Sequence, residues 1–453
     1  MSQAQNYLPQ VREQYELLPY PHRDPELEKM RLSVPLMDRM DAVNHHCFKG
    51  KQDFNDFRVL VAGGGTGDST ILWAEQLRDK KNAEVVYLDM SSASMKITKD
   101  RAKIRDLTNI KWLNESLLDL PDLDLGQFDY INCNGVLHHL EDPDAGLKAL
   151  KSVLKPSGVM FLMVYATYGR TGIYQVQELM RMINDTDDSI HKKISNTRDA
   201  LSCLPEQHWF NLTQKYGWQH DDINDDSALF DLLLHSQDRS YTIGEVHDWL
   251  ENCGLEMTSD PGSPTVQQHY RPETYIKNET LLKQVKQQPL KKQQAISEAL
   301  STQITIHEFY AKHDDQTENT VADIQNPDLV FDCGILIQLP FEKLSGVAKE
   351  QQKEFSITFE QHTQKPTVVF PDGPYIPIIL KHLKSNMPLS ELKKAIETDA
   401  ELSGPFSEDV FWDNVTKLMI NLTQAQMGFL RDKNISPFTL LSVHENRVKD
   451  FYS

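Results

Sequence analysis

The chain has few cysteines, no excess of positive charge and no long apolar run, and each shortage excludes a class of protein. Its five cysteines are scattered, without the close spacing of zinc sites or of a disulfide framework. We therefore expect reduced thiols in a cytoplasmic protein, and no metal site. A net charge of −19, from 47 basic and 66 acidic residues, argues against a broad nucleic-acid-binding surface. The longest apolar run, residues 159–166, is too short to span a bilayer.

The most informative segment is residues 59–70, which read Val-Leu-Val-Ala-Gly-Gly-Gly-Thr-Gly-Asp-Ser-Thr. An apolar run, closely spaced glycines and a helical apolar pattern predict a buried strand, a tight turn and a helix start. A dinucleotide fingerprint would need glycine where Asp68 stands, and the aspartate would repel a pyrophosphate. The loop instead favours the carboxypropyl tail and ribose of S-adenosylmethionine. Its predicted contacts are Gly63, Gly64, Gly65, Thr66 and Gly67.

A second apolar segment, residues 83–90, predicts a parallel strand that ends at Asp89. An acidic residue about 20 positions past a glycine turn can accept hydrogen bonds from both ribose hydroxyls of a nucleoside. The alternative is a purely structural role, in which Asp89 caps the next helix at Ser91 or Ser92. Its position after the glycine loop favours the ribose.

Two more strands are predicted, at residues 128–132 and 159–165. The first begins the segment FDYINCNGVLHHLEDPDAGLKALKSVLKPSG, residues 128–158, and the second follows it. This segment resembles the middle of class I S-adenosylmethionine-dependent methyltransferases, which share a strand, an "LHHL" turn, a helix and "LKPGG". The resemblance extends over about residues 55–260. It implies an α/β fold with a Rossmann-like doubly wound sheet, and methyl transfer to a nitrogen or oxygen of an acceptor that it does not identify.

The resemblance also implies which residues bind the cofactor, although this chain departs from the family's usual residues at two positions. The family usually has an acidic residue where this chain has Val61, and an aspartate near the adenine where it has Ser116. Asp119 is the alternative adenine partner if the loop is offset. Besides the glycine loop and Asp89, the implied cofactor contacts are Met90, Ser116, Leu117, Asn134 and Gly135.

Methyl transfer depends mainly on aligning the nucleophile with the methyl group, and it needs a base only if the acceptor is protonated. The candidate catalytic residues are His139, Tyr165 and Tyr168, which follow the fourth and fifth strands at the ligand edge of the sheet. Asp231 and His235 are four residues apart and would share a helical face. Packing or surface hydrogen bonding is the alternative for all five.

Residues 1–54 form an extension that contains Tyr-Glu-Leu-Leu-Pro-Tyr-Pro at 15–21. Similar segments precede the core in some bacterial methyltransferases. Two prolines stiffen it, so it is either a strap packed on the core or a lid over the site. Its candidate substrate or lid residues are Tyr15, Tyr20 and Asn44.

We expect a methyltransferase domain over residues 55–265, with a helical insert at about 168–237 that builds the acceptor pocket. A helical linker is expected over 266–326, and a smaller α+β module, winged-helix-like, over 327–453. The added module suggests a protein acceptor or a protein partner. A small-molecule methyltransferase, or a non-catalytic scaffold with this fold, is the alternative function.

Overall fold

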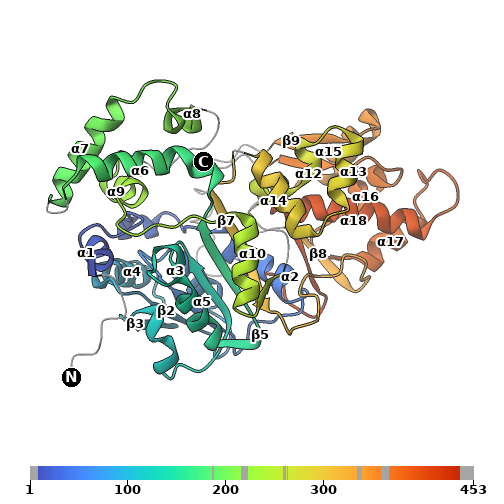
Figure 1. Cartoon of the computed structure of the whole chain (residues 1–453). Helices are drawn as coiled ribbons and strands as arrows, with labels where there is room; N and C mark the ends of the chain where they lie inside the picture. The colour runs from blue at the N-terminus through green and yellow to red at the C-terminus, as the bar shows by residue number, and fades with distance from the viewer. Residues whose placement is uncertain are drawn as a thin grey trace. The chain divides into compact units, whose positions relative to one another are not determined.

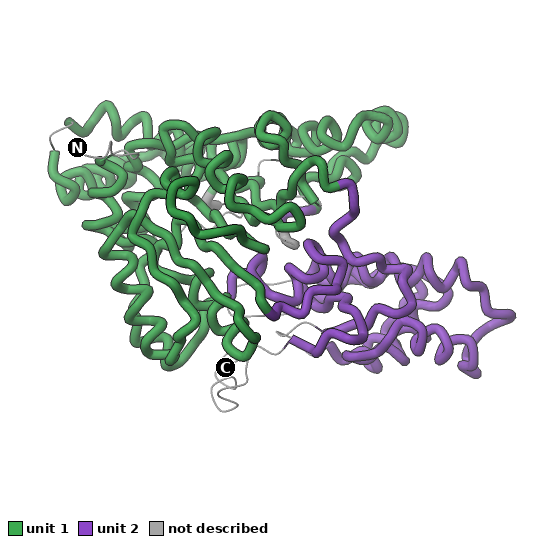
Figure 2. Tube along the Cα trace, turned by 90° about the horizontal axis from the view of Figure 1, so that it is seen from below, with its two compact units in different colours: residues 1–33, 56–262, 268–316 green, residues 34–55, 263–267, 317–453 purple. Residues whose placement is uncertain are grey.

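The computed structural model describes residues 9–185, 188–215, 223–258, 262, 264–301, 303–333, 339–358 and 367–438. The chain divides into two compact units (Figure 2). Unit 1 comprises residues 1–33, 56–262 and 268–316, and unit 2 comprises residues 34–55, 263–267 and 317–453. Among the helices described, none combines the length and apolarity that crossing a bilayer requires.

Unit 1 is built on a seven-stranded sheet with the strand order β3-β2-β1-β4-β5-β7-β6 (Figure 1). The first five strands pair in parallel, and β7 runs antiparallel to both β5 and β6. Inner strands such as β1 read as continuous apolar runs because both faces of the sheet are covered. The strands are β1 (Arg58–Ala62), β2 (Glu84–Leu88), β3 (Ile110–Leu113), β4 (Phe128–Asn134), β5 (Leu154–Tyr165), β6 (Leu255–Met257) and β7 (Ile306–His313).

Helices α3 (Asp68–Gln76), α4 (Ser92–Ile104) and α5 (Pro143–Ser152), with the 3-10 turn η3 (Leu117–Asp122), connect the parallel strands. Their starts follow from local sequence: the Ser91 side chain caps α4, and Asp142 caps α5 just before Pro143. The strand order reverses between β1 and β4, which is where open α/β sheets bind ligands. The predicted doubly wound methyltransferase sheet is therefore confirmed.

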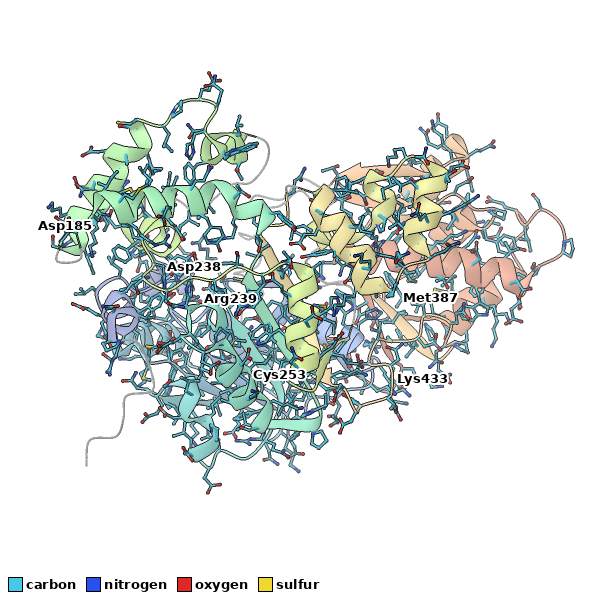
Figure 3. The ribbon with its side chains drawn as sticks, viewed as in Figure 1. Asp185, Asp238, Arg239, Cys253, Met387 and Lys433 are labelled. Carbon is cyan, nitrogen blue, oxygen red and sulfur yellow. The ribbon has the colours of Figure 1, made fainter. Side chains whose placement is uncertain are left out.

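The described part of the expected helical insert contains four helices, α6 (Thr171–Ile183), α7 (Ile190–Ser202), α8 (Trp209–Lys215) and α9 (Asp226–Leu233). Apolar side chains of all four form a separate buried cluster. The segment after α9 contains Asp238, which is labelled in Figure 3. This segment is tied back to α6, because Asp238 accepts a hydrogen bond of 2.8 Å from Gln177. The chain then enters α10 (Ile243–Asn252), which begins with a capping box at Thr242 and Glu245.

The prediction of a helical linker over 266–326 is wrong in part. The segment does contain α12 (Pro272–Tyr275), α13 (Glu279–Lys286) and α14 (Leu290–Leu300), but its strand β7 lies inside the sheet between β5 and β6. Polar residues hide this strand in the sequence. His307, for instance, is fully buried, and its ring bonds the Tyr270 hydroxyl at 2.7 Å and the Tyr241 carbonyl at 2.8 Å.

Unit 2 has a three-stranded sheet, β11-β8-β12, a two-stranded sheet, β10-β9, and helices around one apolar core. Its predicted strands and helices near 356–370, 376–383, 389–396 and 411–422 are present, except that residues 359–366 lie outside the described part. The resemblance to a winged helix stays a prediction. The elements are α2 (Met40–Cys47), β8 (Leu329–Cys333), α15 (Phe341–Gln351), β9 (Phe355–Thr358), β10 (Thr367–Phe370), α16 (Ile376–His382), β11 (Met387–Pro388), α17 (Leu389–Glu397), α18 (Glu408–Gln424) and β12 (Gly428–Asp432).

The expected N-terminal extension, 1–54, is divided between the two units. Residues 1–33 belong to unit 1 and carry α1 (Pro9–Leu17) and the 3-10 turn η1 (Pro25–Lys29), whereas residues 34–55 belong to unit 2. Residues 34–55 belong to unit 2 because a buried guanidinium holds them there. Arg39 pairs with Asp41 at 2.6 Å and donates to the Gln426 carbonyl at 3.0 Å, so this part of the chain cannot separate from unit 2 without exposing those bonds.

Candidate functional site

The loop after β1 has the backbone conformation that glycine adopts most readily. Gly63, Gly65 and Gly67 have φ values of +76°, +49° and +103°. A Cβ atom on Gly63 would lie 2.3 Å from Val136 Cγ2, and one on Gly67 would lie 2.3 Å from Thr98 Cγ2. Packing and backbone conformation thus both require the glycines that the sequence singled out, and the loops after β1 and β4 meet closely at the reversal of strand order.

Asp89 ends β2 beside this loop and joins two backbone elements. Its carboxylate accepts hydrogen bonds of 2.7 Å from the amide of Gly65 and 2.7 Å from the amide of Ser91. Burial raises the pKa of the Asp89 carboxyl to about 6. The side-chain cap of α4 is Ser91, whose hydroxyl accepts from the Ser94 amide, while one oxygen of Asp89 accepts from the Ser91 amide just before that helix. The structural role at Ser91 is therefore present, and the ribose contact stays a prediction. The carboxylate is therefore held beside the glycine loop, as a ribose contact requires.

The residues expected at the adenine follow the carboxyl ends of neighbouring strands. Ser116 is buried, and its hydroxyl accepts from the Leu118 amide at 3.2 Å at the start of η3, while Leu117 is the first residue of that turn. Asp119 also lies within η3. Past β4, half-buried Asn134 leads into Gly135, which has a φ of +75°. Half-buried Met90 directly follows Asp89.

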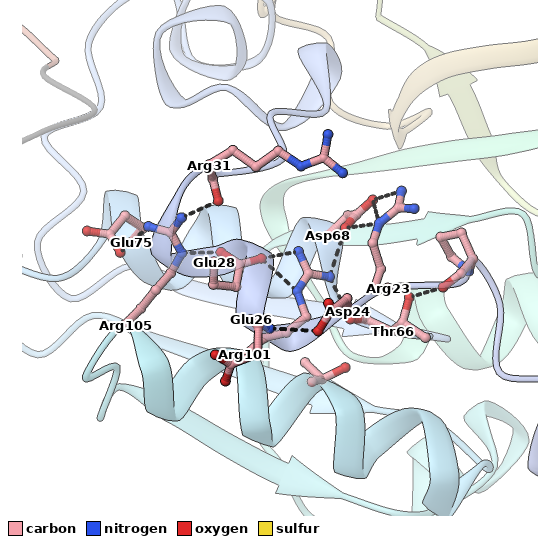
Figure 4. A network of polar contacts seen from close by, with 12 residues as sticks. Arg23, Asp24, Glu26, Glu28, Arg31, Thr66, Asp68, Glu75, Arg101 and Arg105 are labelled. Carbon is pink, nitrogen blue, oxygen red and sulfur yellow. Dashed lines mark hydrogen bonds and ion pairs between the residues drawn. The ribbon is translucent and has the colours of Figure 1, made fainter. Parts of the chain in front are cut away.

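The segment from Tyr15 to Pro25, which we call the strap, runs across the glycine loop. Thr66 donates its hydroxyl to the Pro21 carbonyl at 2.6 Å, and a Cβ atom on Gly65 would lie 2.9 Å from the Tyr20 carbonyl oxygen. Arg23 completes the contact by a bidentate pair to Asp68, with its shortest bond 2.6 Å (Figure 4). Asp68, which argues against a pyrophosphate ligand, therefore anchors the strap.

A buried ion network extends this anchor to α4 (Figure 4). Arg101, 1% exposed, pairs with Asp68 at 2.8 Å and with Glu28 at 2.6 Å, and Arg105 also bonds Glu28. Burial acts to raise the pKa of Asp68, but the Arg23 and Arg101 guanidiniums hold that pKa below its ordinary value. The sequence shows these charges but not their pairing, because their separations of 33 to 77 residues carry no periodic signal.

The strap also contacts the helix that follows Asp89. Glu16 accepts from the Ser92 amide at 2.7 Å and from the Ala93 amide at 3.1 Å, so a carboxylate satisfies the N-terminal amides of α4. Hydrogen bonds from these groups lower the pKa of Glu16 against the effect of burial. The Ser91 hydroxyl donates to the Tyr15 carbonyl at 2.9 Å. The ribose side of the site and the strap therefore share one hydrogen-bonded frame.

A histidine–tyrosine cluster lies past the ends of β4 and β5. It consists of Tyr15, His139, Tyr165, Asp231 and His235. The Tyr15 hydroxyl donates to Asp231 at 2.8 Å and lies 3.3 Å from His235 Nε2, and the Tyr165 hydroxyl donates to the other Asp231 oxygen at 3.3 Å. The rings of His139 and His235 stack with centroids 3.7 Å apart. The structure thus brings together two of the three catalytic candidates, the strap, and both residues from the insert.

Burial sets the charge state of this cluster. It raises the pKa of Tyr15, which the Asp231 charge raises further, and it lowers the pKa of His235 well below the usual value. His138 stacks on Tyr165 at 3.9 Å between centroids, and burial likewise lowers its pKa. Arg170 covers the Tyr165 ring at 3.5 Å. Tyr15 and His235 are therefore held neutral near pH 7.

Two predicted residues lie elsewhere. Tyr168 is 45% exposed in a 3-10 turn (Tyr168–Arg170), where its carbonyl accepts from the Thr171 hydroxyl. Asn44 is fully buried in unit 2, and its side-chain oxygen accepts from the Gln52 amide at 2.9 Å. Sequence position alone suggested both of them, and position does not fix the direction of a side chain.

Comparison with known proteins agrees with this geometry. A family model described as "Methyltransferase domain" matches residues 60–160. An uncharacterized protein of Synechococcus sp. is 34% identical over 200 residues, which are 44% of this chain and 47% of that protein. A ubiquinone biosynthesis O-methyltransferase of Acinetobacter baumannii is 25% identical over 171 residues, 35% of this chain and 70% of that enzyme. The chain thus spans about half the length of the first of these relatives.

A solved structure similar over most of the chain is that of PKMT2 from Rickettsia typhi, with a TM-score of 0.61, 16% identity, and coverage of 90% of this chain and 77% of that one. The same protein in complex with AdoHcy gives a TM-score of 0.58 at 18% identity, over 88% and 76% of the two chains. The family match, the strand order and the glycine loop agree. The chain carries a methyltransferase domain of the class I, S-adenosylmethionine-dependent family.

Proposed function

We propose that the chain transfers a methyl group from S-adenosylmethionine to a nitrogen or oxygen nucleophile of an acceptor. The observation that carries this proposal is the glycine loop with three positive φ values, whose Gly65 amide bonds the Asp89 carboxylate at the reversal of strand order. Bound there, S-adenosylmethionine supplies a methyl group on a positively charged sulfur, which leaves as a neutral thioether. The protein's part is to hold the cofactor and to align the acceptor.

In this proposal the loop contacts the carboxypropyl tail, and Asp89 accepts both ribose hydroxyls, with Met90 alongside. Ser116, Leu117, Asn134 and Gly135 surround the adenine and the methionine end. The acceptor's nucleophile lies against His139 and Tyr165. These residues follow β4 and β5, next to the loop after β1, so donor and acceptor lie at one edge of the sheet. Tyr168, with its exposed ring, has a weaker case.

We propose a protein as the acceptor. The helical insert and unit 2 add far more structure than the methyl donor needs, and the likeness to PKMT2 covers 90% of the chain. The added α+β module is then a surface for a protein partner. The alternative, a small molecule, is supported by the 25% identity to a ubiquinone biosynthesis O-methyltransferase. Val61, in place of the family's acidic residue, supports the second alternative, a scaffold without turnover.

Calorimetric titration with S-adenosylmethionine and S-adenosylhomocysteine tests the donor site. We expect both to bind the full chain, Gly65→Arg to abolish binding, and Asp89→Asn to weaken it roughly 10- to 100-fold, because two bonds to a charged group are lost. Asp100→Asn is the matched control, since Asp100 lies on α4 and pairs with Lys96 at the surface. Absence of binding by the wild-type chain would remove the proposal.

Methyl-labelled S-adenosylmethionine, added with the chain to a cell extract, tests the acceptor. The extract is then separated by size. Label in the protein fraction is the expected result, label confined to small molecules would refute a protein acceptor, and binding without any transfer would favour the scaffold.

Composition supports two further parts of the proposal. The net charge of −19 disfavours a nucleic-acid acceptor. All five cysteines are free thiols, which suits a cytoplasmic location.

A further inference from the structure

The backbone of one residue, Gln237, contacts both stacked histidines of the histidine–tyrosine cluster. The carbonyl of Gln237 lies 2.8 Å from His139 Nδ1, and the amide of Gln237 donates to His235 Nδ1 at 3.1 Å. A carbonyl only accepts and an amide N–H only donates. Neutral His139 therefore carries its proton on Nδ1 and has a lone pair on Nε2, whereas neutral His235 has its lone pair on Nδ1 and its proton on Nε2.

The remaining protons of the cluster follow from this assignment. Since His235 Nε2 bears a proton, it donates toward the Tyr15 oxygen at 3.3 Å, and the Tyr15 hydroxyl then donates to Asp231 at 2.8 Å. The Tyr165 hydroxyl donates to the second Asp231 oxygen. In this arrangement both tyrosine hydroxyls and one histidine act as donors, and His139 Nε2 is the basic nitrogen of the cluster.

The same three groups could in principle hold a metal ion, because ligand atoms of His139, Asp231 and His235 all lie within 4.8 Å of one another. A histidine binds a metal through an unprotonated nitrogen. The Gln237 amide occupies that nitrogen on His235 and leaves a protonated one facing the cluster. The hydrogen bonds thus favour proton transfer over cation binding.

We infer that His139 Nε2 is the general base of the methyl transfer, and that Gln237 and the strap residue Tyr15 are positioning residues that fix the tautomers and the alignment of the cluster. The inference rests on the proposed function. In the step, the acceptor's N–H or O–H bond breaks and its proton passes to His139 Nε2. The freed electron pair forms the bond to the methyl carbon, and the pair of the broken carbon–sulfur bond stays on sulfur.

The surroundings of His139 suit a base that becomes positively charged. A ring nitrogen of His139 lies within 4.8 Å of a carboxylate oxygen of Asp231, so this carboxylate balances the charge that the ring acquires, and the Gln237 carbonyl already accepts from Nδ1. His235, buried and neutral, adds no competing charge to the stack. The titratable and charged groups that face His139 are His138, Tyr165, Asp231, His235 and Tyr15, with Arg170 on the far side of the Tyr165 ring.

The tautomers can be read without knowing the acceptor. Long-range ¹H–¹⁵N correlation spectra of the full chain, with ¹⁵N-labelled histidine, distinguish a protonated Nδ1 from a protonated Nε2. We expect His139 as the Nδ1–H form and His235 as the Nε2–H form, assigned through His139→Gln and His235→Gln. The reverse assignment, or the loss of both proton signals on addition of Zn²⁺ alone, would overturn the inference.

Turnover provides the second test, with methyl-labelled S-adenosylmethionine and the same cell extract. His139→Gln should reduce methyl transfer roughly 100- to 10,000-fold, the contribution of a general base, while S-adenosylhomocysteine binds as tightly as before. Tyr15→Phe removes the hydroxyl between Asp231 and His235, so it should lower turnover and shift its pH dependence. His191→Gln, on the exposed face of α7, is the control. Unchanged turnover of His139→Gln would overturn the inference alone, whereas failure of the wild-type chain to bind S-adenosylhomocysteine would overturn the proposed function.

Discussion

The carboxyl group of Asp89 should make cofactor affinity and protein stability respond to pH in opposite directions. Burial raises its pKa to about 6 in the free protein. Ribose hydroxyls donate to the ionised carboxylate, so bound cofactor favours the deprotonated form. At pH 5 about a tenth of the carboxyl is ionised, so affinity for S-adenosylmethionine should be about tenfold lower than at pH 8, or ~1.4 kcal/mol.

The stability of the free protein should fall as the pH rises, whereas the affinity for the cofactor should increase. The folded pKa lies above the ordinary value of about 3.9, so the folded state binds this proton more readily than the unfolded state does. Above pH 6 the buried charge costs stability, and the cost is removed as the pH falls from about 6 to 4. A difference of about two pKa units corresponds to roughly 3 kcal/mol as an upper bound.

Both effects can be isolated by comparison with Asp89→Asn, because other carboxyls that titrate in this range are common to the two proteins. Calorimetry at pH 5 to 8 should show a pH-dependent affinity in the wild type that is nearly absent in the variant. Urea unfolding over the same range should show that the free energy of unfolding of the wild type, measured relative to that of Asp89→Asn, falls as the pH rises. Equal pH dependence of affinity in both proteins would refute the assignment of Asp89 to the ribose.

Three further outcomes are expected for the strap and the glycine loop. Arg23→Ala and Asp68→Asn, combined in a double-mutant cycle followed by urea unfolding, should give a coupling energy of about 1 kcal/mol, because the pair is partly exposed; strictly additive effects would contradict the anchor. Deleting residues 1–24, which retains Glu28, should weaken cofactor binding in calorimetry while leaving the far-ultraviolet circular dichroism unchanged. If the truncated protein binds the cofactor with full affinity, the strap only packs on the core and does not contribute to binding. Gly67→Ala should cost roughly 3 kcal/mol in thermal unfolding from its φ of +103° and its clash with Thr98, and near-wild-type stability would show that the loop can rearrange.

The donor half of the site was predictable because its signals are local. The glycines at 63, 65 and 67 lie within five residues, and each is needed for a turn that the same segment forms. Asp89 follows directly from the end of an apolar strand. His139 and Tyr165 could be placed at the same edge because the carboxyl ends of parallel strands necessarily share it.

The acceptor half and the strap could not be predicted in this way. Tyr15 bonds Asp231 across 216 residues, and no pattern along the chain records which tyrosine reaches which carboxylate. The strand β7 was missed because an inner strand can bury polar side chains once tertiary partners satisfy them, as His307 does with Tyr270.

The sequence by itself therefore determined the parallel strands of the sheet, the kind of donor and the edge at which we propose that the donor binds, since these depend on short-range apolar patterning and on backbone angles open to glycine. Only the tertiary structure decided which residues form the histidine–tyrosine cluster, how the N-terminal extension divides between the units, and which nitrogen of His139 carries a proton. Each of these depends on a contact between distant segments, and the last depends on the backbone N–H and C=O of one residue, Gln237.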